Sequence, residues 1–159
     1  MWASNPWHRI HVDFAEDEKR HYHILRDAHY RWPEIFYIPR DTTEASTIPI
    51  LRELLAKYGM PVHCVSDNEP QFRSEEFTCF LKMNGAKHVR VAPYHAASNG
   101  LVERMVQSFK NHVKASEDRK LSIQQRTRNF LHTNRSTRHP TTVIFLLLTL
   151  LFTKNQRNG

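Results

Sequence analysis

The chain has 159 residues, 40% of them hydrophobic and 25% charged, which predicts one folded domain and excludes a disordered or collagen-like chain. Its 2 cysteines are too few for a disulfide framework or a paired-cysteine zinc site, so we expect a reduced, intracellular protein. The net charge of +7 is uneven: residues 1–80 hold 9 basic and 13 acidic side chains and residues 81–159 hold 14 and 3, which points to a polyanionic partner such as nucleic acid, with a solvated basic face as the alternative.

The first part of the chain predicts three antiparallel strands and a helix. Polar and apolar residues alternate over residues 7–14, which indicates a strand that ends near Asp13. Residues 22–25 and 34–38 are shorter segments rich in strand-forming side chains. Residues 43–58 repeat apolar side chains every three or four positions and are followed by Gly59, as expected for a helix and its end.

The second part alternates strands with helices. We expect strands at residues 62–66 and 87–92, and between them a helix over residues 74–84 with Ser74 as its N-cap. Two further helices are predicted at residues 99–116 and 122–135, the first with an apolar stripe. The stripe consists of Val102, Val106, Phe109 and Val113. This order predicts an α/β fold, a five-stranded mixed sheet flanked by helices whose later strands run parallel to the first.

Three carboxylates stand at positions where such a sheet gathers functional groups. Asp13 and Asp67 follow two strands, and Glu103 lies in the first turn of the expected amphipathic helix. Carboxylates brought together repel each other, and a divalent cation removes the conflict; their oxygens suit Mg²⁺ or Mn²⁺. Taken singly, each acid is better explained as a turn former or a helix cap, because acids often follow strands in those roles.

The segment around Asp67, residues 65–114, resembles the catalytic core of retroviral-type integrases, above all those of Ty3/gypsy-like retrotransposons. Thirty-five residues separate Asp67 from Glu103, the spacing of that family's Asp-Asp-Glu signature. The segment WHRIHVDF is similar to the strand of the first aspartate, TIPILRELLAKYGMP to the following helix and turn, and NRSTRHPTT to a later family motif. The resemblance covers residues 7–142 and implies a ribonuclease-H-like fold.

The resemblance implies DNA integration by metal-dependent polynucleotidyl transfer, in which a 3′ end is processed and then joined to target DNA. It assigns Asp13, Asp67 and Glu103 both the catalytic role and the binding of two Mg²⁺ or Mn²⁺ ions. It further implies that DNA contacts His95 and Asn99 in a loop and Gln107, Lys110 and Lys114 on a helix, that the protein forms a homodimer or higher oligomer, and that its substrate places it in the nucleus.

Several features depart from the family pattern. Glu69 replaces a glycine and would strain the turn if φ is positive there. Ala96 replaces a proline. We expect residues 1–142 to form the core and residues 143–159 to be a divergent apolar tail, truncated or degraded relative to the family. The apolar run of that tail has only ten residues, so we expect no membrane anchor. We also expect no zinc, with His21 and His23 on a strand surface.

Two readings other than an integrase core fit the same residues. A catalytically impaired, domesticated remnant could bind nucleic acid or protein through the same fold, as Glu69 and the altered tail favour. A nuclease of the same fold is a weaker third reading. Retention of all three carboxylates favours the enzyme.

Overall fold

The computed structural model describes residues 5–17, 20–38, 44–91, 96–117 and 120–136. The predicted tail, residues 143–159, and His95 lie outside these ranges, as do the side chains of Ala96 and Asn99. The strands are β1 (Arg9–Asp17), β2 (Arg20–Asp27), β3 (Pro33–Ile38), β4 (His63–Ser66) and β5 (Lys87–Arg90). The helices are α1 (Glu44–Tyr58), α2 (Pro70–Arg73), α3 (Glu75–Met83), α4 (Ala96–Ala115) and α5 (Ile123–Ser136).

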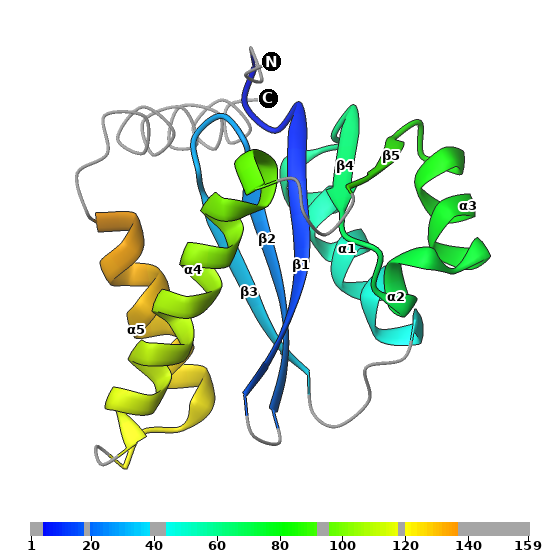
Figure 1. The fold of residues 1–159 in the computed structure, drawn as a ribbon. Coiled ribbons are helices and arrows are strands. Elements are labelled where there is room, and N and C mark those ends of the chain that lie inside the picture. Colours follow the sequence, from blue (N-terminus) through cyan, green and yellow to red (C-terminus); the bar gives the residue numbers. More distant parts are fainter. Residues whose placement is uncertain (1–4, 18–19, 39–43, 92–95, 118–119, 137–159) are drawn as a thin grey trace, which may run out of the picture.

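One sheet of five strands, in the order β3-β2-β1-β4-β5, forms the centre of the molecule (Figure 1). The first three strands form an antiparallel meander, and β4 and β5 continue the sheet parallel to β1. Short hairpin connections suffice for the antiparallel pairs, whereas the parallel pairs need the helical crossovers supplied by α1 and α3. The predicted mixed α/β sheet is confirmed.

Helices cover both faces of the sheet and bury a separate apolar core on each. On one face, Leu51 and Leu54 of α1 and Phe77 of α3 pack against Ile10 of β1. On the other face the core lies under α4 and α5 and consists of Ala15, Tyr22, Ile24, Ile35, Met105, Phe109, Val113 and Phe130. Burial of a large apolar side chain contributes about 1.5–3 kcal/mol each, so these two cores supply most of the stabilisation.

Local chemistry sets the ends of α1 and α3. The Ser74 hydroxyl accepts a hydrogen bond from the Phe77 amide at 3.0 Å, so Ser74 is the N-cap that the sequence predicts. Gly59 and Gly85 follow α1 and α3 with φ of 84° and 78°, a backbone region that glycine adopts without steric cost.

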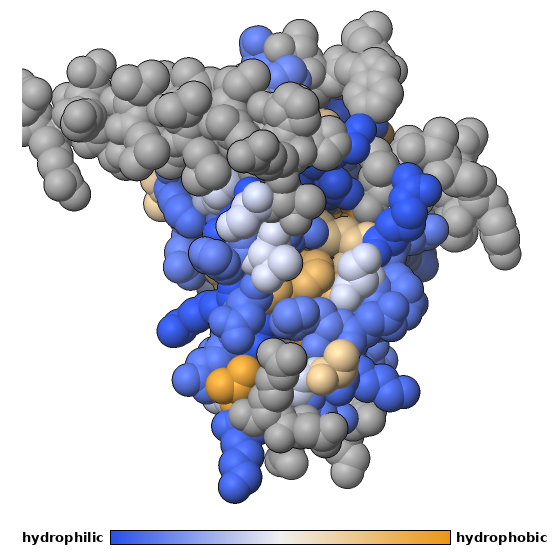
Figure 2. Space-filling view, turned by 90° about the vertical axis from the view of Figure 1, so that its left-hand side faces the viewer, coloured by the Kyte–Doolittle hydropathy of each residue, from blue (hydrophilic) through white to orange (hydrophobic). Residues whose placement is uncertain are grey.

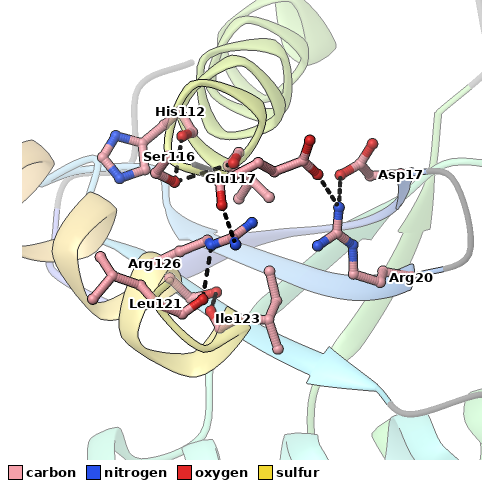
Figure 3. A network of polar contacts seen from close by, with 10 residues as sticks. Asp17, Arg20, His112, Ser116, Glu117, Leu121, Ile123 and Arg126 are labelled. Atoms are coloured by element: carbon pink, nitrogen blue, oxygen red, sulfur yellow. Dashed lines mark hydrogen bonds and ion pairs between the residues drawn. The ribbon is translucent and has the colours of Figure 1, made fainter. Parts of the chain in front are cut away.

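A polar network holds the C-terminal end of α4 to its surroundings (Figure 3). The Arg20 guanidinium binds Asp17 and Glu117, each at 3.1 Å, and so ties the β1–β2 hairpin to the end of α4. Arg126 of α5 donates to the Leu121 carbonyl at 3.0 Å and to the Glu117 carbonyl at 3.1 Å. These bonds satisfy backbone groups in the connection between α4 and α5 and fix the position of α4 along the sheet.

Three local predictions are wrong. β1 continues to Asp17, so Asp13 lies in the middle of the strand and not at its end. His23 is buried, with its Nε2 2.9 Å from the Thr47 hydroxyl of α1, because it faces the core under α1. Met105, which the predicted stripe omits, is buried beneath α4, whereas Val106 is only partly buried. Among the described residues, no helix is long and apolar enough to cross a membrane.

Candidate active site

The parallel pairing of β1 with β4 places Asp13 beside Asp67. Within that pairing, His11 lies opposite Val65. The same register continued by two residues brings Asp13 level with Asp67, at the point where β4 has ended and the chain turns away. β1 continues past this point with β2 as its partner, so Asp13 sits where the two strands separate. Such a divergence between neighbouring parallel strands is where ligand sites form in α/β sheets.

Asp13 is held in a partly buried position among other acids. Its Oδ1 accepts a hydrogen bond from the Phe14 amide at 2.8 Å, which favours the ionised form. Burial opposes ionisation more strongly, and the charges of Asp67, Glu69 and Glu103 add to it, so the pKa of Asp13 is raised from 3.8 to about 7. Asp13 is therefore under the influence of the two other carboxylates that the sequence predicts, and of Glu69 as well.

The turn after β4 orients Asp67 and Glu69. The Glu69 amide donates to Asp67 Oδ1 at 3.0 Å, and Gln71 Nε2 donates to Glu69 Oε2 at 2.5 Å. Glu69 has φ −63° and ψ 148°, an extended conformation open to any residue, so the strain expected at this position does not arise. Burial, and for Glu69 also the charge of Asp67, raises the pKa of both carboxyls.

Glu103 approaches the same region from α4, which packs across β1. Val102 and Met105 on either side of it are buried, whereas the Glu103 side chain is exposed. The helix therefore uses one face for the core and presents the carboxylate on another. Its charge acts on Asp13, which places Glu103 on the same side of the sheet as Asp13.

The donor chemistry fits a divalent cation, but the described side chains do not yet form a complete ligand set. Carboxylate oxygens are the ligands that Mg²⁺ and Mn²⁺ prefer, and a cation would remove the cost of ionising Asp13 beside other acids. Among the described residues, no three His, Cys, Asp or Glu side chains are close enough to hold one ion together. A shared ion therefore requires at least one carboxylate, most simply the exposed Glu103, to change rotamer.

The predicted helical DNA contacts share one side of α4 with Glu103. At 100° per residue, Gln107, Lys110 and Lys114 fall within about 40° of Glu103 around the axis, and they follow it along the axis by about 6, 10 and 16 Å. Gln107 and Lys114 are exposed and Lys110 is partly buried. Gln107 Nε2 donates to Asn111 Oδ1 at 2.9 Å. His95 and the Asn99 side chain are outside the described residues, so their roles stay predictions.

Comparison with known proteins links this arrangement to one family. The sequence matches the integrase core domain family over residues 3–96. The uncharacterized protein K02A2.6 of Caenorhabditis elegans is 32% identical over 135 residues, which cover 84% of this chain and 11% of that protein. The catalytic core domain of BIV integrase is similar in structure, with a TM-score of 0.72, 21% identity, and coverage of 83% of this chain and 86% of that one. For the HTLV-2 integrase catalytic core domain in complex with magnesium, in its dimeric form, the TM-score is 0.70, the identity 23%, and the coverage 85% and 90%.

These likenesses differ in what they establish. The structural similarity confirms the ribonuclease-H-like fold that the sequence predicts. The family match over residues 3–96 includes Asp13 and Asp67 and ends before Glu103, whose assignment depends on its position on α4. The chain spans only 11% of the length of the worm relative, so the activity and partners of a longer protein are not carried over to it.

Proposed function

The chain belongs to the integrase core domain family, and from that membership we propose that it catalyses metal-dependent polynucleotidyl transfer on DNA, namely 3′-end processing and strand transfer of retroelement ends. One observation carries the proposal: β1 pairs in parallel with β4, in a register that brings Asp13 level with Asp67, and α4, which carries Glu103, packs across β1. A carboxylate that burial and like charge keep from ionising near neutral pH is the expected mark of a cation site in the cation-free protein.

In this proposal, Asp13 and Asp67 form the fixed part of the site and Glu103 completes it. Asp13 is held by the Phe14 amide and Asp67 by the Glu69 amide, so both carboxylates are oriented before any ion binds. Two Mg²⁺ or Mn²⁺ ions, once bound, would activate the attacking oxygen and neutralise charge at the phosphorus. The protein's own contribution is to hold the phosphodiester in an orientation that suits attack and to disfavour other orientations of it.

DNA would lie along α4 in this arrangement. Gln107, Lys110 and Lys114 extend from Glu103 along one side of the helix, and cations in such a row contact phosphates without reading sequence. His95 and Asn99 would add contacts from the loop before α4. Residues 81–159 carry 14 basic and 3 acidic side chains, which supports a polyanionic substrate.

Further parts of the proposal follow from the family and not from the geometry. We assign residues 1–142 to the catalytic core, with Ty3/gypsy-like retroelements as the source lineage. A homodimer or higher oligomer is proposed by analogy with the dimeric form of the HTLV-2 domain. Action on chromosomal DNA would place the protein in the nucleus.

A strand-transfer and disintegration assay on labelled oligonucleotides tests the activity directly. The wild-type protein should give joined and resolved products with Mn²⁺ or Mg²⁺ and none in EDTA. Asp13→Asn should lower the yield of these products at least 100-fold, because the variant keeps the shape of the side chain but loses a charged ligand. Products that persist in Asp13→Asn would show that the activity does not come from this site.

Two observations favour a second candidate, a catalytically impaired remnant that binds nucleic acid. The described carboxylates do not form a complete ligand set, and Glu69 adds a further negative charge beside Asp67. If the wild-type protein binds DNA yet forms no product with either metal, and Glu69→Gly restores product, the remnant reading is correct. Catalysis by the wild type excludes it.

A further inference from the structure

A buried serine lies directly before Asp67, and its hydroxyl makes two hydrogen bonds. Ser66 is the last residue of β4 and is only 2% exposed. Its Oγ lies 2.8 Å from Nε2 of His88 on β5 and 3.0 Å from the main-chain carbonyl oxygen of Asp67. A buried hydroxyl without hydrogen bonds is costly, so these two contacts fix the Ser66 side chain.

The pairing of β4 with β5 brings Ser66 and His88 together. In this parallel pairing Cys64 lies opposite His88. Ser66 follows Cys64 by two residues, so the two share one face of the sheet and Ser66 lies diagonally across from His88. Cys64 belongs to the core under α1 and α3, and the His88 ring packs edge-on against Phe77 of α3, with 5.1 Å between the ring centroids. The Ser66–His88 pair therefore lies on the face that α1 and α3 cover.

The Ser66 hydroxyl holds the main chain of Asp67 where the sheet ends. The Val91 amide donates to the Ser66 carbonyl at 2.9 Å, which extends the contact between the two chain segments to the last residue of β4. One residue further on, the Asp67 carbonyl accepts from the Ser66 hydroxyl instead. The Asp67 carboxylate accepts from the Glu69 amide at 3.0 Å. Asp67 is thus held at its main chain and at its side chain by two separate bonds.

The single proton of the Ser66 hydroxyl determines which nitrogen of His88 carries a proton. A hydroxyl donates one hydrogen bond and can accept two. Because this hydroxyl donates to the Asp67 carbonyl, its bond with His88 requires a proton on Nε2 of the ring. Burial, and after it the charge of Arg90, lowers the pKa of His88, so the ring is neutral at pH 7 and carries one proton. The bonds therefore run from His88 to Ser66 and from Ser66 to Asp67.

The pair supports Asp67 from the side of the sheet that faces away from Asp13. Asp13 shares the other face with Ala15, which packs beneath α4 and α5. The outer surface of that layer is mostly hydrophilic, with a small apolar hollow at its centre (Figure 2). Ser66 and His88 are therefore outside the carboxylate group, and they act on it only through the position of Asp67.

We propose that Ser66 and His88 are positioning residues of the cation site, which hold the main chain at Asp67 so that its carboxylate stays beside Asp13. The inference rests on the proposed function, because it assumes that Asp67 binds a cation. It deepens that function by assigning the orientation of one ligand to two residues that touch neither the ion nor DNA. Outer residues that orient a ligand typically change metal affinity 10–100-fold when they are substituted.

Metal titrations of variants test the proposal. Mg²⁺ or Mn²⁺ that binds the folded protein raises its melting temperature, and the dependence of this rise on metal concentration gives the Kd. Ser66→Ala and His88→Leu should each raise the Kd about tenfold, because Asp67 loses its main-chain support. Ser66→Thr keeps the hydroxyl, and His88→Gln keeps a donor near the place of Nε2. Both should recover most of the affinity.

Ser116→Ala is the matched control. Ser116 is also buried, and its hydroxyl donates to a main-chain carbonyl, that of His112, at 2.8 Å, beyond the end of α4 that is far from Glu103. This variant should lower the melting temperature of the metal-free protein, as Ser66→Ala does, and leave the metal Kd unchanged. If Ser66→Ala and His88→Leu also keep the wild-type Kd, the pair only stabilises the sheet and the proposal is wrong.

The protonation of His88 gives a test that needs neither metal nor a variant. Nitrogen-15 NMR of the wild type at neutral pH should show the His88 ring protonated at Nε2. A ring protonated at Nδ1 would mean that Ser66 donates to His88 and not to the Asp67 carbonyl, which overturns the proposal. This measurement also decides the case in which Ser66→Ala does not fold.

Asp67→Asn separates this proposal from the proposed function. If Asp67→Asn loses metal binding while Ser66→Ala and His88→Leu bind metal as the wild type does, the cation site stands and the positioning role is wrong. If the wild type itself shows no metal-induced rise in melting temperature, the cation site is wrong, and the positioning role with it.

Discussion

The Asp67 carboxylate offers the most direct test of cation binding. Ions that bind only the folded protein stabilise it, by about 2.7 kcal/mol at a hundredfold excess over Kd. Mg²⁺ or Mn²⁺ should therefore raise the melting temperature of the wild type by several degrees. Asp67→Asn should abolish the rise, while its side-chain oxygen still accepts the bond from the Glu69 amide. Differential scanning fluorimetry measures both.

Asp17→Asn is the control for this experiment, because Asp17 lies on the same strand as Asp13 and pairs with Arg20 at 3.1 Å. Like Asp67→Asn, this substitution removes one negative charge, but at a position outside the group formed by Asp13, Asp67 and Glu103. The metal-induced rise should survive in Asp17→Asn. An equal rise in wild type and Asp67→Asn would show that the ions bind elsewhere.

The raised pKa of Asp13 predicts that, in the absence of metal, the stability of the protein depends on pH in a distinctive way. Its pKa is about 7 in the folded protein and 3.8 as the ordinary value, so between these pH values the folded state holds a proton that the unfolded state has lost. The contribution of Asp13 to stability is therefore full below pH 3.8 and is lost as the pH rises through 7. Asp13→Asn removes this loss.

We therefore expect metal-free Asp13→Asn to be more stable than the wild type at pH 8, by about 1–2 kcal/mol after screening by solvent, and the two to converge at pH 4. Urea unfolding in EDTA at several pH values measures the difference. Saturating Mg²⁺ should reverse the order at pH 8. A constant difference from pH 4 to pH 8 would mean that Asp13 ionises normally.

At the scale of single elements, α4 combines a core face with a basic face. Phe109 and Val113 are buried, whereas Lys114 is exposed and Lys110 partly buried. Lys110→Ala and Lys114→Ala should each weaken binding to a DNA duplex and reduce the salt slope by about one, because each removes one phosphate contact. Alanine keeps the helix, so circular dichroism should be unchanged.

Lys82→Ala on α3 is the control, since Lys82 is exposed in the helical layer on the other face of the sheet. Its affinity and salt slope should equal those of the wild type. If Lys82→Ala changes the slope as much as Lys114→Ala does, binding follows the net charge of the molecule and not the face of α4.

Sequence periodicity predicted the long elements and their order because each has one strong local signal. α1 and α3 show apolar spacing with glycine at the end, and Ser74 caps α3 as its hydroxyl predicts. Errors arise where a distant partner decides the outcome. β1 runs to Asp17 because β2 pairs with it from Ile10 to Asp17, which the alternation in residues 7–14 does not reveal.

The site shows the same division between local and distant causes. That Asp13 and Asp67 come together follows from the parallel strand order, which the sequence predicts. The extended backbone at Glu69 does not follow from the predicted strand order, because it depends on Pro70, which begins the short helix α2.

At the scale of the whole molecule, an ionic network around the buried Glu34 joins helices that lie on opposite faces of the sheet. Glu34 of the edge strand β3 accepts a hydrogen bond from the Tyr58 hydroxyl and lies 3.3 Å from Lys57 Nζ, both at the end of α1. Its other oxygen lies 3.0 Å from Arg135 of α5. Glu34 therefore connects the two helical layers around the edge of the sheet.

The network makes stability depend on the ionised form of Glu34. Burial works against ionisation, but the Tyr58 hydroxyl and the charges of Arg135 and Lys57 outweigh it and hold the pKa of Glu34 below its usual range. A carboxyl with a lowered folded pKa contributes stability above its unfolded value, near pH 4.5, and loses that contribution as the pH falls through the folded value.

Glu34→Gln should therefore lower the free energy of unfolding by about 1–2 kcal/mol at pH 7, because it removes the charge that Arg135 and the solvent-screened Lys57 share. The loss should shrink at pH values below the pKa of Glu34. Glu117→Gln is the control: it breaks the half-exposed pair with Arg20 and should cost about 0–1 kcal/mol. Urea unfolding at pH 7 and pH 3 measures all three proteins. Equal losses for the two variants would mean that the α1–β3–α5 connection is not a stabilising unit and that the two helical layers depend only on their apolar cores.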